Sequence, residues 1–169
     1  LRQISNKQIK EDEFFSKTTM EDILNEVIQY FKETSSKRLI LNLDSDKNKF
    51  DFLRSPELIY GLRNFIGNAV KFAKSSIEIK IISNSNNLEV SINDDGPGFP
   101  DDIIESLGEP YIKSKSTTVV KNAGTGLGTF LGKTLLERKS ARLSFLKDKK
   151  LGGASVNIIW AIIDLKSNV

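Results

Sequence analysis

The chain has 169 residues, of which 38% are hydrophobic, with ten Phe and one Trp, so it is long enough for one domain with a hydrophobic core. Its net charge is +3 and its Lys and Arg residues are scattered, which argues against a nucleic-acid-binding surface. The absence of Cys excludes disulfides and Cys-based metal sites, and the absence of His excludes histidine chemistry within the chain.

The first residues differ from the rest of the chain. They are polar, show only a weak helical repeat and begin at Leu1 without Met. We therefore expect residues 1–17 to be the end of a preceding helix and a linker, and residues 18–169 to form the domain. No apolar run reaches the roughly 18 residues that span a bilayer, so we expect that this fragment does not itself cross a membrane. The absence of Cys agrees with a location in the reducing cytosol.

Hydrophobic spacing predicts alternating helices and strands along the domain. The first helix should be capped by Thr18 or Thr19, and the second should begin at Pro56, which suits a first helical position. Phe50–Leu53 should pair with the strand before it across a polar turn. Together the elements predict an α+β fold, a mostly antiparallel sheet with helices on one face. The expected helices cover Glu21–Glu33, Pro56–Ala73, Asp101–Leu107 and Leu127–Lys139, and the expected strands cover Leu39–Leu43, Phe50–Leu53, Ile77–Ile82, Leu88–Ile92, Arg142–Leu146 and Ala154–Ile163, the last two joined at Gly152-Gly153.

A long polar segment at Gly108–Ala123 has little periodicity and is rich in Ser, Thr and Lys. Long loops inside one domain are uncommon and are often functional. We expect this segment to be a mobile lid that becomes ordered over a bound ligand.

Three polar residues share one stripe of the second helix. Asn64, Asn68 and Lys71 lie at positions i, i+4 and i+7 of an otherwise apolar helix. Asn is unfavourable inside helices, so two in one stripe suggest a function. In that function, one amide oxygen would bind a metal ion, and the other amide and the Lys71 ammonium would lie near phosphates. A solvent-facing polar stripe is the simpler alternative and stays open on this motif alone.

The second motif, Asp94-x-Gly96-x-Gly98, follows the strand that ends near Ile92. An Asp-Gly turn is its simplest explanation, but Pro97 lies between the glycines and no strand follows promptly, which disfavours a tight hairpin. A carboxylate at the end of a strand accepts hydrogen bonds from an exocyclic amine, and glycines let a flat ring approach the backbone.

The third motif, Gly124-x-Gly126-x-Gly128, leads into a helix, where backbone N–H groups bind phosphate. Two familiar alternatives fail. A Rossmann loop needs its third glycine where Leu131 stands, and a P-loop ending in Gly132-Lys133-Thr134 needs its first glycine where Leu127 stands.

Taken together, the three motifs resemble the N, G1 and G2 boxes of the catalytic ATP-binding domains of sensor histidine kinases, which share a superfamily with gyrase, heat-shock chaperone and mismatch-repair ATPases. Gly152-Gly153-Ala154-Ser155 resembles the last G box, and Pro110-Tyr111 resembles the F box. Thr129 and Tyr111 depart from the usual residues. The resemblance covers about residues 18–165, and Gly108–Tyr111 and Lys133–Arg138 further resemble redox-responsive kinases of the RegB/PrrB type.

The resemblance implies a two-layer α/β sandwich of the Bergerat type with a nucleotide lid, binding ATP and Mg²⁺. It implies that Asp94 accepts a hydrogen bond from the adenine amine beside Gly96 and Gly98, with Ser155 supporting the ring through water. It implies that Asn68 coordinates Mg²⁺ and that Asn64 and Lys71 contact phosphates as catalytic residues. The remaining implied ligand-binding residues are Tyr111, Lys113 and Lys115 of the lid region and the amides of Thr125, Gly126, Leu127 and Gly128.

The resemblance also implies partners outside this chain. The phosphoryl acceptor would be a histidine on the dimerisation domain of the same kinase, whose last helix would end in residues 1–17, and a response regulator would act downstream. The fragment would be the cytosolic part of a membrane-anchored bacterial sensor.

Two other functions remain open. A nucleotide-gated binding module would use ATP to order the lid without chemistry, and an anti-sigma kinase would phosphorylate serine.

The resemblance also bears on ATP hydrolysis. Related ATPases place a Glu where this chain has Asn64, so we expect poor ATP hydrolysis.

Overall fold

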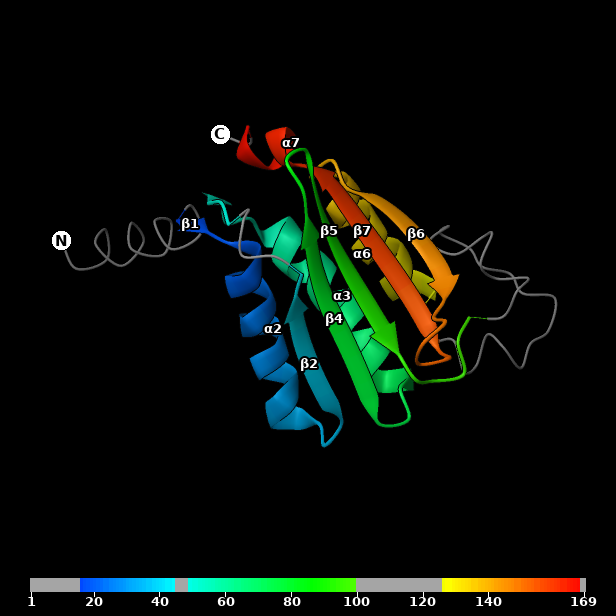
Figure 1. The fold of residues 1–169 in the computed structure, drawn as a ribbon. Coiled ribbons are helices and arrows are strands. Elements are labelled where there is room, and N and C mark those ends of the chain that lie inside the picture. Colours follow the sequence, from blue (N-terminus) through cyan, green and yellow to red (C-terminus); the bar gives the residue numbers. More distant parts are fainter. Residues whose placement is uncertain (1–15, 45–48, 100–125, 168–169) are drawn as a thin grey trace.

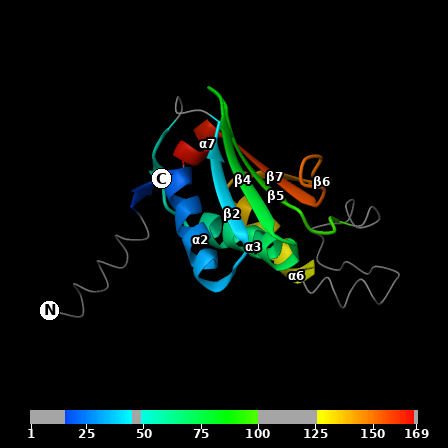
Figure 2. The ribbon, with the colours of Figure 1, turned by 60° about the horizontal axis from the view of Figure 1, so that its bottom comes forward.

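Five strands form a sheet that carries helices on one face, in the computed structural model of the chain (Figures 1 and 2). The structure describes residues 16–44, 49–99 and 126–167, and the side chains of residues 126–128 are not described. In chain order the elements are β1 (Lys17–Thr18), α2 (Met20–Thr34), β2 (Arg38–Leu43), β3 (Phe52–Leu53), α3 (Pro56–Phe72), β4 (Ser76–Ser83), β5 (Asn87–Asp94), α6 (Gly126–Glu137), β6 (Arg142–Lys147), β7 (Ala154–Ala161) and α7 (Ile162–Lys166).

Helices α2 and α3 begin where the sequence predicts, because each has a side-chain cap. The Asp22 amide donates to Thr19 Oγ1 at 3.2 Å, and the Leu58 amide donates to Ser55 Oγ at 3.2 Å. At the other end of α3, Lys37 Nζ donates to the carbonyl oxygens of Val70 and Lys71. A cation there satisfies the last carbonyls and complements the helix dipole.

The sheet has the order β2-β4-β5-β7-β6, in which β2 and β4 are parallel and the other neighbours are antiparallel. The predicted mixed, mostly antiparallel sheet is therefore confirmed. Strand alternation points Ile77, Ile79 and Ile92 toward the helices, where all three are almost completely buried. Asp94 is the cross-strand partner of Ile77, so its side chain also takes the helical face of the sheet.

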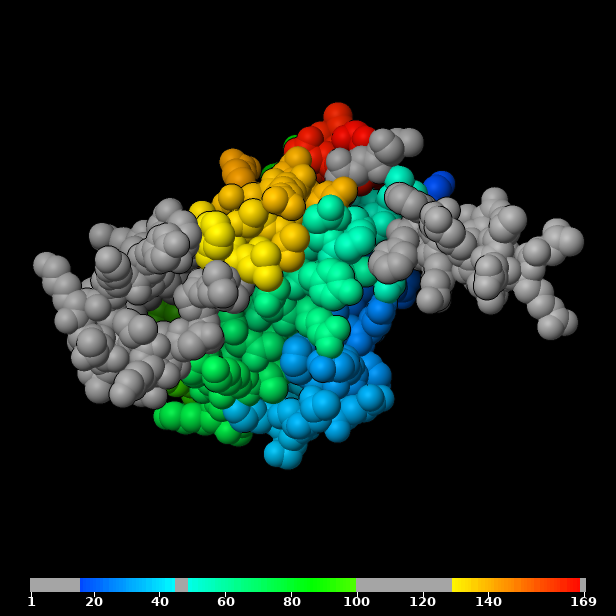
Figure 3. All heavy atoms as spheres, turned by 180° about the vertical axis from the view of Figure 1, so that it is seen from behind, coloured from blue at the N-terminus to red at the C-terminus, as the bar shows by residue number. Residues whose placement is uncertain are grey.

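Helices α2, α3 and α6 lie side by side over that face, as the space-filling view from the helical side shows (Figure 3). The central helix α3 contributes Leu58, Leu62, Phe65 and Ile66 to the core, each no more than 2% exposed. Its position between its two neighbours brings the other side of α3, which carries the polar stripe, alongside α6.

The predicted pairing of Phe50–Leu53 with Leu39–Leu43 is wrong. β3 pairs instead with β1, with Thr18 opposite Phe52, and β2 pairs in parallel with β4 after the chain crosses over through α3. The parallel register puts Leu39 beside Ile77 on the helical face, where both are buried. A hairpin with the two-residue β3 offers β2 no such continuous apolar neighbour.

The C-terminal end also differs from the prediction, since the last strand was expected to continue to Ile163. β7 ends at Ala161, whose partner Asn87 is the first residue of β5, so the ladder has no further residues to pair. The Ile162 amide donates to the Asn86 carbonyl at 2.8 Å, and α7 then buries Ile162 and Leu165 while Ile163 stays 74% exposed.

The other expected helices and strands within the described residues are confirmed to within two residues at each end. Three predicted segments lie wholly or mostly outside the described residues, namely the helix end and linker of residues 1–17, of which residues 1–15 are not described, the helix at Asp101–Leu107 and the lid at Gly108–Ala123. The boundary expected at residues 17 and 18 falls inside β1. Within the described ranges, no helix is both long enough and apolar enough to cross a bilayer.

Candidate functional site

A buried carboxylate ends the central part of the sheet. Asp94 is only 4% exposed, and its Oδ1 accepts hydrogen bonds from the amides of Gly96 at 2.8 Å and Ala154 at 3.2 Å. Burial raises the pKa of Asp94 above its ordinary value, although these two amides act to lower it, and the nearby Asp95 and Asp148 carboxylates raise it further. The two amides contact Oδ1, and no described protein group donates to Oδ2, which is available to a ligand.

Two glycines leave room around Asp94 that no other residue would leave. A Cβ at Gly153 would lie 2.3 Å from the Asp94 carbonyl oxygen and 2.4 Å from Oδ1. A Cβ at Gly96 would lie 2.4 Å from the Phe72 carbonyl oxygen. Gly98 has φ of 78°, a left-handed conformation that favours glycine. The sequence motif is thus explained by close backbone contact on both sides of the carboxylate.

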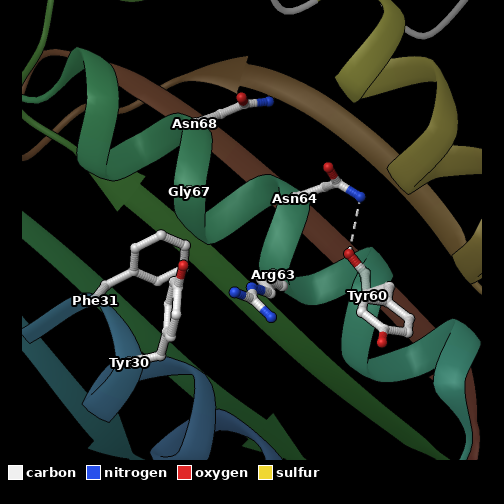
Figure 4. A pocket seen from close by; sticks show the side chains of 7 residues that line it. All are labelled: Tyr30, Phe31, Tyr60, Arg63, Asn64, Gly67 and Asn68. Atoms are coloured by element: carbon white, nitrogen blue, oxygen red, sulfur yellow. Dashed lines mark hydrogen bonds between the residues drawn. The ribbon is translucent and has the colours of Figure 1, made fainter. Parts of the chain in front are cut away.

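Helix α3 presents two asparagines on the side that faces α6 (Figure 4). Asn64 Nδ2 donates to the Tyr60 carbonyl oxygen at 2.9 Å, and Asn68 Nδ2 donates to Thr129 Oγ1 on α6 at 3.3 Å. Each amide nitrogen therefore has a partner, which leaves each amide oxygen as an acceptor for a ligand. Neither asparagine is fully exposed or fully buried.

The other predicted ligand residues fall into two groups. Lys71 lies exposed at the last turn of α3, with Nζ 5.3 Å from the centre of the Phe72 ring. Gly126, Leu127 and Gly128 begin α6, as expected for amides at a helix N-terminus. Tyr111, Lys113, Lys115 and Thr125 lie outside the described residues.

Ser155 does not join the group around Asp94. Its hydroxyl donates to Asn93 Oδ1 at 2.6 Å, and Asn93 is its cross-strand partner. Because successive residues of a strand point to opposite faces, Asn93 and Ser155 occupy the face of the sheet away from Asp94 and the helices. Ala154 is the β7 residue that reaches Asp94, through its backbone amide.

Helix α6 passes very close to α3 beside Asn64. A Cβ at Gly132 would lie 3.1 Å from the Asn64 Cβ, and a Cβ at Gly61 would lie 2.6 Å from the Leu136 side chain. Gly132 belongs to the segment that mimics the end of a P-loop, and its place in the middle of α6 confirms that it is no P-loop. Its small size serves helix packing.

An open hollow of about 380 Å³ lies on the outer side of α3, toward α2. Asn64 and Asn68 border it on one side, while Tyr30 and Arg63 stack on the other, with the Arg63 guanidinium 3.9 Å from the centre of the Tyr30 ring (Figure 4). The asparagine stripe, Asn64 and Asn68, is therefore accessible from solvent. A purely solvent-facing stripe would not explain why Asn68 donates a hydrogen bond to Thr129.

The residues present fit a Mg²⁺ ion held together with a nucleotide. Within the described ranges, no group of three or more acidic, His or Cys side chains is placed to hold a metal. Mg²⁺ is commonly bound through few protein oxygens plus phosphates and waters. The Asn68 amide oxygen would be such a ligand, because the amide nitrogen is engaged by Thr129 and the oxygen is left as an acceptor.

The sequence places the chain in a known family. A sequence model of the histidine kinase-, DNA gyrase B-, and HSP90-like ATPases matches residues 54–164, more than half of the chain. The chain belongs to this ATPase family. The matched region, which belongs to an ATP-binding domain, contains Asp94 and the asparagine stripe of α3.

Sensor histidine kinases are among the curated relatives. Over 132 residues the chain is 36% identical to the sensor histidine kinase RegB of Cereibacter sphaeroides, an alignment that covers 69% of this chain and 29% of RegB. It is 27% identical over 161 residues to the sensor histidine kinase AruS of Pseudomonas aeruginosa, covering 90% of this chain and 15% of AruS. The chain thus spans less than a third of the length of each of these two relatives.

Solved structures have the same fold. The mycobacterial sensor histidine kinase MprB superposes with a TM-score of 0.69 at 15% identity, covering 87% of this chain and 97% of that one. The ATP binding domain of PrrB from Mycobacterium tuberculosis gives a TM-score of 0.63 at 18% identity, covering 85% and 94%. The fold is that of histidine kinase catalytic domains, as the sequence predicts.

Two contributors to the site were missed by reading the sequence. Gly153 was recognised only as part of a weak motif, although it packs directly on Asp94. Thr129 was noted as a departure from the family pattern, although its hydroxyl accepts the bond that orients Asn68. The signal for Gly153 was its Gly-Gly dipeptide before a strand, and for Thr129 it was a polar residue where an apolar one is usual.

Proposed function

We propose that this chain is the ATP-binding catalytic domain of a sensor histidine kinase of the RegB type, and that it transfers the γ-phosphoryl group of ATP to a histidine on a separate dimerisation domain. The family match supports ATP, and the kinase relatives support the reaction. The buried Asp94 carboxylate is the single observation on which the specificity for adenine rests.

The environment of Asp94 suits recognition of an amine. Oδ1 is held by two backbone amides, and the free Oδ2 accepts from the adenine N6 amine. Guanine has a carbonyl oxygen at that position, which would repel the carboxylate and leave it without a partner. An unsatisfied buried acceptor costs about 1–3 kcal/mol, which corresponds to roughly a 5- to 150-fold preference for ATP.

The polar side of α3 supplies the phosphate end of the site. Asn68 would bind Mg²⁺ through its amide oxygen, and Asn64 and Lys71 would contact phosphate oxygens. The amides that begin α6 add the positive end of a helix dipole. A Mg²⁺ ion held there would supply neutralisation of the phosphate charge, and phosphoryl transfer depends mainly on such neutralisation and on positioning.

The acceptor must come from outside the chain, because the chain contains no histidine. The bond between the γ-phosphorus and the β–γ bridging oxygen breaks, a bond to an imidazole nitrogen forms, and ADP leaves. Asn64 offers no base to activate water, so hydrolysis should be slow. The response regulator and the membrane anchoring of the whole protein are further parts of this proposal, suggested by the sensor kinase relatives.

Calorimetric titration tests the nucleotide assignment. With Mg²⁺ present the chain should bind ATP more tightly than GTP, and Asp94→Asn should remove most of the affinity, because an amide nitrogen can face the adenine amine. Asp164→Asn on α7, at the opposite end of the β5–β7 ladder, is the matched control and should bind normally. Equal binding of ATP by the Asp94→Asn variant would exclude the assignment.

A further inference from the structure

A second carboxylate, directly after Asp94, holds a different loop. Asp95 Oδ1 accepts from three consecutive backbone amides, those of Lys74 at 2.8 Å, Ser75 at 3.0 Å and Ser76 at 3.2 Å. Asp95 Oδ2 accepts from the Ser75 hydroxyl at 2.7 Å. Burial acts to raise the pKa of Asp95, but these hydrogen bonds outweigh it and lower the pKa well below its ordinary value.

These bonds join two elements that carry opposite ends of the nucleotide site. The segment from Lys74 to Ser76 connects the end of α3 to the start of β4, and Asp95 follows the last residue of β5. The Asp95 amide also donates to the Ser76 carbonyl oxygen at 3.3 Å. The α3–β4 connection is therefore bound to the residue after Asp94 by both side chain and main chain.

The same junction is closely packed on its inner side. Gly96 lies so near the last residue of α3 that a Cβ there would come within 2.4 Å of the Phe72 carbonyl oxygen. The backbones of Gly96 and Phe72 are therefore in direct contact. Together with this contact, the hydrogen bonds of Asp95 fix the distance between the end of α3 and the end of β5. Lys71 lies one residue before Phe72, and Asn68 lies one turn further back.

We infer that Asp95 is a positioning residue for ATP, which sets the phosphate-contacting helix α3 at the correct distance from the adenine-contacting Asp94. The inference rests on the proposed function of the site. Asp95 itself does not contact the nucleotide. It acts through the backbone of residues 74–76, and it should matter most for a ligand that contacts both ends of the site together.

A purely structural role for Asp95 predicts something different. If the bonds only stabilised a turn, removing them would lower the free energy of unfolding and leave binding unchanged, or would weaken all ligands alike. A positioning role predicts that ATP loses affinity and that adenosine, which reaches only the Asp94 end, does not. The ratio of the two affinities separates the roles.

The experiment compares variants by calorimetry with Mg-ATP and by competition with adenosine. Asp95→Ala should weaken ATP by about tenfold or more and leave adenosine within about twofold, since several charge-assisted hydrogen bonds are lost. Asp95→Asn should rescue ATP binding to within about threefold, because its amide oxygen can still accept from the three backbone amides and Ser75 can turn its hydroxyl to accept. ATP binding by Asp95→Ala at the wild-type level, or equal weakening of ATP and adenosine, would overturn the inference.

Glu26→Gln is the matched control. The Glu26 carboxylate accepts two hydrogen bonds from Arg54, at 2.7 and 2.8 Å, and its pKa is likewise lowered, chiefly by those bonds, but it lies on α2 away from Asp94. It should lower the unfolding midpoint without changing either affinity. A loss of ATP affinity in this control equal to that of Asp95→Ala would also count against the inference.

Amide hydrogen exchange tests the junction without nucleotide. Asp95→Ala should speed exchange at Ser75 and Ser76 and in the last turn of α3, while exchange in α2 stays unchanged; unchanged exchange at Ser75 and Ser76 would overturn the inference even if the wild type binds ATP. If the wild type binds no ATP at all, the proposed function fails. That failure is distinct from a failure of the Asp95 inference, because it is seen in the wild type before any variant is compared.

Discussion

At the scale of single residues, the proposed adenine end of the site depends on the absence of a side chain at Gly153. A Cβ at Gly153 would meet Asp94 Oδ1 at 2.4 Å and the Gly96 amide nitrogen at 2.6 Å. We predict that Gly153→Ala displaces the carboxylate and weakens ATP binding by about tenfold or more, equivalent to about 1.4 kcal/mol or more of binding free energy. Titration calorimetry measures this loss directly.

The neighbouring glycine provides the control for that prediction. Gly152 has φ of 84°, and a Cβ there would meet nothing within 4 Å. Gly152→Ala should therefore cost stability through its left-handed backbone, about 1 kcal/mol, and leave ATP affinity unchanged. The prediction fails if Gly153→Ala binds ATP as tightly as Gly152→Ala does.

Asp94 and Asp95 are neighbours whose pKa values move in opposite directions. For Asp94 the pKa is raised in the folded state, so the stability it contributes is present at low pH and is lost as pH rises through that pKa. For Asp95 the pKa is lowered, so its contribution is present above the unfolded-state pKa and is lost as pH falls through the folded-state pKa.

The contrast predicts opposite behaviour of two matching variants. Asp95→Asn should lower the free energy of unfolding near neutral pH, with the deficit shrinking in acid. Asp94→Asn should be at least as stable as the wild type near neutral pH, because it removes a buried charge. Urea unfolding at several pH values checks both, and carboxyl-carbon NMR titration should show Asp94 losing its proton at higher pH than Asp95. The reverse order of titration would contradict the argument.

Some site residues could be predicted from sequence and others could not, and the difference has a physical cause. Asp94 and the asparagine stripe stand in short local patterns, and a helix or strand repeat fixes which side chains share a face. The bond from Asn68 to Thr129 joins residues 61 positions apart, and nothing local determines it. Strand alternation puts Ser155 on the face of the sheet away from Asp94. A comparison of motifs does not take the two faces of a strand into account.

At the scale of elements, the same limit separates confirmed predictions from wrong ones. Helices α2 and α3 carry their own signals, an apolar stripe and a side-chain cap, so their bounds were predicted closely. The pairing of β3 with β1 depends on what else competes for the edge of β2, and that competition involves β4, which lies beyond α3. The change from β7 to α7 depends on where β5 begins, which is also remote in sequence.

The crossing of α3 and α6 yields a prediction at this scale. Gly61 meets the fully buried Leu136, and a Cβ at Gly61 would lie 2.6 Å from two of its side-chain carbons. Gly61→Ala should therefore destabilise the fold by about 1–3 kcal/mol through overpacking. Leu136→Ala alone should cost about 2–5 kcal/mol by leaving a cavity.

The double variant decides whether these two effects share one contact. A methyl group added at Gly61 fills part of the space that Leu136→Ala leaves, so the combined cost should be smaller than the sum by about 0.5 kcal/mol or more. Denaturant unfolding of the four proteins gives this difference. Simple additivity of the two costs would show that α6 does not pack on α3 at Gly61 in solution.

At the scale of the whole molecule, the proposed site is assembled from β5, α3, α6 and the turn before β7, and the chain contains no histidine to accept a phosphoryl group. We predict that the isolated chain neither labels itself with γ-phosphate-labelled ATP nor hydrolyses ATP appreciably, since it lacks histidine and the Asn64 amide is no base to activate water. It should label a histidine on an added dimerisation domain, slowly and at high concentration, because no covalent tether raises the local concentration.

Asn68→Ala should abolish that transfer while leaving adenosine binding largely intact, because it removes the proposed protein ligand of Mg²⁺ and leaves Asp94 untouched. The matched control is Asn25→Ala, the same substitution at an exposed position of α2, which should transfer normally. Acid-labile phosphate on the acceptor identifies phosphohistidine. Steady ATP hydrolysis by the chain alone that survives Asn64→Ala would contradict the division between a binding domain and a separate acceptor, and would favour the ATP-hydrolysing branches of the family. Nucleotide binding without any transfer to an acceptor would favour a nucleotide-gated binding module.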